Sequence, residues 1–179
     1  IGGGTSYLTP EDSLFLKSQG YTIIFDNVQA LRSDKSQKLC SLFNPKQLPY
    51  EIDKDITKFP SLAESTRIAI EKLSSNDKGF ILMVEGSLVD WAAHANDPAT
   101  LAKEFLGFDA ACKVALNFAK QNGETAVIIT SDHGTGGITI GRGDWPRYSE
   151  YSASELFGQL MRYRSSAQVV ASKIRATAP

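Results

Sequence analysis

The hydrophobic and polar positions of this chain divide it into short apolar runs and longer amphipathic stretches. Two short runs rich in β-branched and aromatic residues, at 22–28 and 38–43, predict two short strands. Two further runs, at 79–86 (GFILMVEG) and 126–131, are apolar almost without interruption. Such continuous runs are typical of strands that are buried on both faces of a parallel sheet.

The stretches between these runs have helical periodicity. Residues 10–20 predict a helix that stops at Gly20, and 61–73 predict one that begins just after Pro60. A third helix is expected from about 99 to 121, closed by an Asn-Gly pair. Strand, helix and strand in that order predict an α/β fold with a parallel sheet and right-handed crossovers.

The character of the sequence changes after Gly137. Residues 138–179 are polar at first and then form a helical stretch from about Ala153. We therefore expect this tail to be an insertion or a truncated segment.

Composition and charge limit the functions that are compatible with this fold. The chain has 179 residues, 42% of them hydrophobic, and a formal net charge of −1. Acidic and basic residues are mixed, so the sequence shows no electrostatic footprint for a nucleic acid, and a small partner is expected. No apolar stretch approaches the roughly 18 residues of a membrane span. Cys40 and Cys112 lie among apolar neighbours in no CxxC spacing, which predicts free thiols.

Candidate ligands follow both of the continuous apolar runs. The first run delivers Glu85, then Asp90 and His94, whose four-residue spacing places them on one face of a helical turn. The second delivers Asp132 and His133, so both histidines of the chain stand beside an aspartate. Each pair alone is also typical of a surface ion pair or a loop. Together, at the carboxyl ends of two parallel strands, they indicate a multi-metal centre.

Longer motifs around these residues add a family resemblance. MVEGSLVDWAAHANDP at 83–98 and VIITSDHGTGG at 127–137 closely resemble the alkaline phosphatase family, with its VEGSxIDxxxHxND and TxDHxxGG wordings. The segments IGGG, QGYTIIFD and SLFNPKQLPYEID also agree, so the resemblance covers about residues 1–140. It implies a three-layer α/β/α sandwich with a largely parallel sheet. Residues 1–179 would be one partial domain of this kind, in which 138–179 begins an insertion or a crown-like segment.

The resemblance also implies a phosphomonoesterase with two Zn²⁺ ions and one Mg²⁺. By motif position, Asp90 and His94 correspond to ligands of one zinc, Asp132 and His133 to ligands of the second, and Glu85 to a ligand of the magnesium. In this family a serine alkoxide attacks phosphorus, and water activated by zinc then hydrolyses the phosphoserine. A phosphate monoester substrate, a periplasmic or extracellular location and a homodimer are further expectations.

Several family residues have no counterpart in this sequence. The nucleophilic serine is expected upstream of Ile1, and no histidine follows His133 to complete the first zinc site. The chain therefore resembles a C-terminal-half fragment that we expect to be inactive alone. Two alternatives stay open at this point: a phosphodiesterase or sulfatase of the same superfamily, and a non-catalytic relative that binds metal or phosphate.

Overall fold

The computed structural model of the chain describes residues 1–139 and 147–177, and the chain divides into two compact units. The first unit comprises Ile1–Pro49, Lys54–Glu85 and Gly107–Ile129, and the second comprises Tyr50–Asp53, Gly86–Leu106 and Thr130–Pro179. The long helix α5, Pro98–Asn122, contributes residues to both units.

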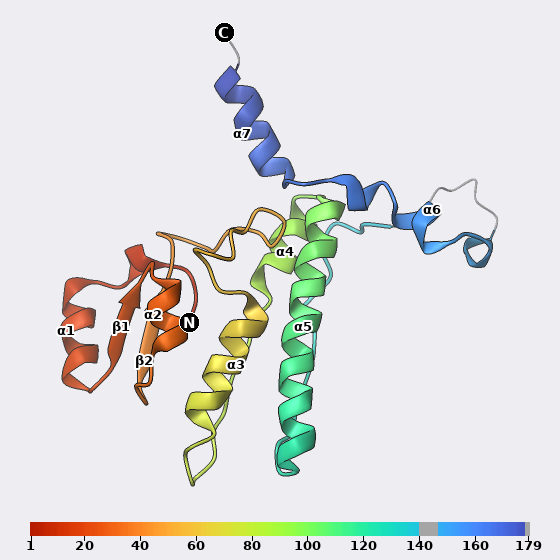
Figure 1. Cartoon of the computed structure of the whole chain (residues 1–179). Helices are drawn as coiled ribbons and strands as arrows, with labels where there is room; N and C mark the ends of the chain where they lie inside the picture. The colour runs from red at the N-terminus through yellow and green to blue at the C-terminus, as the bar shows by residue number, and fades with distance from the viewer. Residues whose placement is uncertain (140–146, 178–179) are drawn as a thin grey trace. The chain divides into compact units, whose positions relative to one another are not determined.

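A parallel strand pair forms the sheet of the first unit. Strand β1, Thr22–Phe25, pairs with β2, Leu39–Leu42, with Ile23 opposite Cys40 (Figure 1). Helix α1, Pro10–Ser18, packs beside β1 and is preceded by the short 3₁₀ turn η1, Thr5–Tyr7. Both short strands and the first helix were predicted from the sequence, and the structure confirms them.

Two more helices enclose the core of this unit. Helix α2, Val28–Ser33, was not predicted; Asn27 caps it by accepting a 2.8 Å hydrogen bond from the N–H of Ala30. Helix α3, Leu62–Leu73, begins after Pro60 as predicted, and Ser61 caps it. The cluster at the centre is buried and entirely apolar, and consists of Val28, Leu31, Phe43 and Ile68.

Ion pairs fix α2 and the loop after it to α3. Arg32 donates two hydrogen bonds to Glu64, at 2.7 and 3.0 Å. Lys72 donates to the carboxylate of Asp34 at 2.5 Å, and about a tenth of each of these two side chains is exposed. The second pair is therefore almost buried.

The two runs predicted as buried strands are not strands within the residues that the structure describes. Both are extended, but neither has a neighbouring strand, and Ile81, Met83 and Ile128 are 97%, 84% and 88% exposed. The prediction of strands buried on both faces is wrong for the described structure. A run is buried on two faces only where further strands and a second layer cover it.

One side of these extended segments is covered. A cavity of about 340 Å³ lies between them and the helices α3 and α5, and its lining is mostly apolar. Phe80 and Phe118 face each other across it with ring centroids 6.1 Å apart. Cys112 also lines the cavity and, like Cys40, is a half-buried free thiol, as predicted.

The second unit contains the helix α4, Ser87–His94, the first turns of α5 and the C-terminal helices. After Thr139 the described residues form short helices. These are η2 at Tyr148–Glu150, α6 at Ala153–Phe157, η3 at Leu160–Arg162 and α7 at Ala167–Thr177. Of the predicted segment 138–179, residues 140–146 and 178–179 lie outside the described residues. None of the helices described has the length and apolarity that a membrane crossing requires.

Candidate metal centre

Helix α4 presents two of the predicted ligands on one face. Its residues Leu88, Ala92 and Ala93 are buried on one side of the helix. Asp90 and His94, four residues apart, lie on an adjacent face, with the Nε2 of His94 3.4 Å from the Oδ1 of Asp90. The spacing in the sequence therefore produces the predicted juxtaposition.

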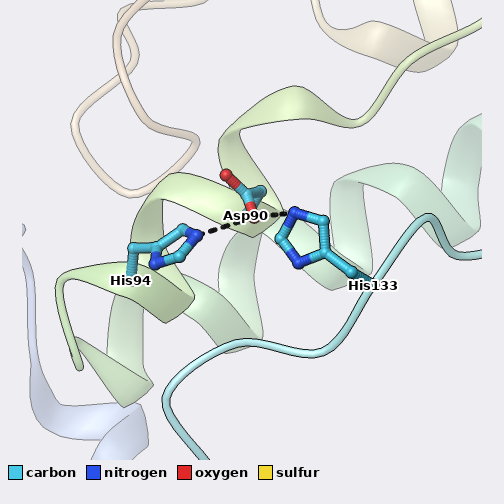
Figure 2. Close-up of side chains that lie close together, drawn as sticks. All are labelled: Asp90, His94 and His133. Carbon is cyan, nitrogen blue, oxygen red and sulfur yellow. Dashed lines mark ion pairs between the residues drawn. The ribbon is translucent and has the colours of Figure 1, made fainter.

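The third side chain comes from the loop that follows the second apolar run. The Nε2 of His133 lies 3.6 Å from the same oxygen of Asp90, and the two imidazole rings have centroids 5.9 Å apart. Figure 2 shows the rings on two sides of the carboxylate, both directed toward it. One ligand atom from each of these three residues falls within 4.8 Å of the others.

The Oδ1 of Asp90, between the two rings, is a buried polar atom. Asp90 Oδ1 is shielded from solvent and has no hydrogen-bond partner among the described residues. A buried carboxylate oxygen without a donor is costly, and a cation would satisfy it. One carboxylate and two imidazoles are a donor set that zinc accepts, so the residues present fit the metal that the sequence predicted.

A backbone hydrogen bond sets the tautomer of His133. Its Nδ1 lies 2.8 Å from the carbonyl oxygen of Gly134, which can only accept, so Nδ1 carries the proton. In the neutral imidazole the lone pair is then on Nε2, the atom that faces Asp90. This bond, followed by the charges of Asp132 and Asp90, raises the pKa of His133 above its usual value.

The other two predicted ligands lie outside this three-residue group. Asp132 is largely exposed; its Oδ1 accepts a 2.9 Å hydrogen bond from the N–H of His133, which lowers the pKa of Asp132. Its Oδ2 is 3.5 Å from the Nε2 of His133. Glu85 is exposed and ends its extended segment in the first unit. The division of Asp90, His94, Asp132 and His133 between two zinc ions stays a prediction.

The corner between α4 and α5 contains Asn96, which the sequence analysis did not single out, and Asp97. Asp97 caps the N-terminus of α5, because its Oδ1 accepts a hydrogen bond of 3.1 Å from the N–H of Thr100. Asn96, just before it, has a positive φ of 50°, and its Oδ1 would lie 3.0 Å from a Cβ atom added at Gly136, in the loop of His133. The feature of the sequence that could have indicated this close approach is the glycine-rich run after His133, because glycine leaves room for a neighbouring side chain.

Comparisons with known proteins agree on one family. The alkaline phosphatase family model matches residues 7–178. Alkaline phosphatase 4 of Bacillus subtilis is 44% identical over 144 residues, which are 79% of this chain and 31% of that protein. The cold-active alkaline phosphatase of Shewanella is 32% identical, with a TM-score of 0.85 over 99% of this chain and 42% of that one.

The alkaline phosphatase of Thermus thermophilus gives a TM-score of 0.80 at 27% identity, over 93% of this chain and 36% of that one. These structural matches confirm the predicted α/β fold class. The chain spans less than half the length of each of these relatives. Because its motifs, its fold and nearly its whole length match, the chain belongs to the alkaline phosphatase family.

Proposed function

We propose that this chain supplies part of the metal centre of a phosphomonoesterase that acts through a phosphoserine intermediate. The observation that carries the proposal is the buried Oδ1 of Asp90, which lies between two imidazoles and has no hydrogen-bond partner among the described residues. The name of the Bacillus relative supports the reaction class, and the activity belongs to the complete protein because the chain spans 31% of that relative's length.

Each side chain has a defined part in the proposed centre. Asp90 and His94 would hold one Zn²⁺, Asp132 and His133 a second, and Glu85 a Mg²⁺. When bound, these ions act as Lewis acids that polarise the phosphoryl group and lower the pKa of water. The carbonyl of Gly134 holds the Nδ1 proton of His133 and so keeps Nε2 available as a ligand. The carboxylate of Asp90, close to both rings, balances the positive charge of the site.

The first experiment measures zinc in the purified chain by elemental analysis and by titration. We expect zinc to be retained by the native chain and lost in Asp90→Ala and in His133→Ala. The matched control is Asp109→Ala, since Asp109 is a carboxylate on α5 paired only with an exposed lysine in the described contacts. Equal zinc binding by Asp90→Ala and Asp109→Ala would refute the proposed ligands.

Activity separates the proposed reaction from its alternatives. The complete protein should hydrolyse a phosphate monoester faster than a diester or a sulfate ester, and Asp90→Ala should abolish this turnover. The isolated chain should show little turnover of any of them. A preference for the diester, or zinc binding without turnover by the complete protein, would replace the proposed reaction by one of the alternatives.

Three further expectations belong to this proposal. The complete enzyme would act in the periplasm or outside the cell, and it would form a homodimer. Residues 138–179 would begin an insertion in the α/β domain, which the short helices of the described part favour over a continued strand and helix alternation. Size-exclusion chromatography with light scattering tests the dimer.

A further inference from the structure

We propose that the contact between Asn96 and Gly136 positions the loop of His133 against helix α4, so that His94 and His133 reach the same carboxylate. Asn96 and Gly136 are positioning residues in this proposal and bind no metal themselves. The inference deepens the proposed metal site and rests on it for its functional meaning. The contact itself is testable without metal.

The backbone on the α4 side of the contact is held by a helix-ending motif. The N–H of Asp97 donates to the carbonyl of Ala92 at 3.1 Å, and the N–H of Asn96 donates to that of Ala93 at 3.0 Å. Asn96 occupies the left-handed region between them, with φ at 50°, which asparagine tolerates better than most residues. The position of the Asn96 side chain relative to His94, two residues earlier, is therefore set by the end of α4.

Asp97 fixes the same corner from its other side. Its carboxylate accepts hydrogen bonds from Thr100 and, at 2.7 Å, from the N–H of Ala167 at the start of α7. Burial alone would raise the pKa of Asp97, but these donors hold it below its usual value, so the carboxylate is charged at neutral pH. The corner is thus attached to both α5 and α7, and it can act as a rigid support.

The loop of His133 approaches this support at Gly136. A Cβ atom at position 136 would lie 3.0 Å from the Oδ1 of Asn96, and 3.7 Å from its Cγ and Nδ2. At Gly134, in the same loop, no atom lies within 4 Å of such a Cβ. Neither glycine has a positive φ. Gly136 is therefore required for close approach and not for its backbone conformation.

The contact lies next to the two rings that it would align. Asn96 follows His94 by two residues, and Gly136 follows His133 by three. A side chain at 136 must displace either Asn96 or the loop by a few tenths of an ångström. Where the loop moves, the distance of 3.6 Å between His133 Nε2 and Asp90 Oδ1 changes by a similar amount. Metal sites tolerate only about 0.2 Å of error in ligand distance, so this displacement affects zinc binding.

The test uses the two histidines of the chain as probes. With two rings, the imidazole protons give two sets of NMR signals, and a nuclear Overhauser effect between the sets reports the 5.9 Å ring separation without metal. We expect Gly136→Ala to weaken this effect and to raise the Kd for zinc about tenfold or more, as is typical for residues that orient ligands. Gly2→Ala is the matched control, because a Cβ atom there meets no atom within 4 Å and the position lies outside the site; it should change neither the ring-to-ring effect nor the Kd for zinc.

Two variants that change Asn96 distinguish the loss of this contact from misfolding of the chain. Asn96→Gly keeps the positive φ and cannot clash, but it removes the side chain that Gly136 touches, so it should also weaken the effect between the rings. Combining Asn96→Gly with Gly136→Ala places a methyl group in the space that the amide leaves. This double variant should partly restore both the nuclear Overhauser effect between the rings and the affinity for zinc.

Several outcomes would overturn the inference. An unchanged ring-to-ring effect in Gly136→Ala would do so, as would a double variant no better than either single variant. If the native chain shows the ring-to-ring effect but binds no zinc, the proposed function fails while the positioning contact stands.

Discussion

Replacing Lys72 by methionine should lower the free energy of unfolding by about 2–3 kcal/mol at pH 7. Methionine keeps the apolar part of the side chain, but the change removes two hydrogen bonds of the ammonium, to Asp34 at 2.5 Å and to the carbonyl of Ser36 at 2.7 Å. Asp34 keeps the donors of Ser36, so the cost is below the 3–5 kcal/mol typical of a fully buried pair.

The effect should depend on pH with a definite sign. Burial by itself would raise the pKa of Asp34, but Lys72 and Ser36 bring it below its usual value. The stabilisation is therefore complete above the unfolded pKa of about 3.9 and is lost as the pH falls through the folded value. Without Lys72 the folded pKa of Asp34 rises, and protonation removes the unpaired charge. The difference between native chain and variant should shrink as the pH is lowered from 7 to about 3.

Urea unfolding followed by circular dichroism at both pH values measures this difference. Lys113→Met is the matched control, because Lys113 forms a 2.9 Å pair with Asp109 on the exposed side of α5. We expect no measurable change for the control at either pH. A Lys72→Met effect that is no larger than the control, or that is equal at both pH values, would refute the reasoning.

Two further variants and one control test the packing within each unit. Asp97→Ala should lower the free energy of unfolding by about 1–2 kcal/mol and speed tryptic cleavage within α7, because the N–H of Ala167 loses its acceptor; unchanged cleavage would contradict the role of Asp97. Phe118→Ala should cost about 2 kcal/mol by removing the ring that faces Phe80, measured by urea unfolding. Ile81→Ala, at a 97% exposed position, should cost nothing, and an equal loss would contradict the described exposure.

Much of the local structure could be predicted from residue spacing. Helices α1, α3 and α5 lie where the periodicity placed them, and the Asp90 and His94 pair shares a helical face as the four-residue spacing required. These features depend on hydrogen bonds and side-chain spacing within one segment, so the segment's own sequence determines them. The family resemblance was confirmed for the same reason, since its motifs are also local.

Only the tertiary structure decided which distant groups meet. The continuous apolar runs predicted strands covered on both faces, yet burial depends on neighbouring layers, and Ile81 and Ile128 are exposed in the described structure. The approach of His133 to Asp90, and of Gly136 to Asn96, joins segments separated by the whole of α5. The sequence determined the side chains available for the site, whereas packing of the helix corner against the loop determined their distances, because contacts between segments depend on how the whole chain folds.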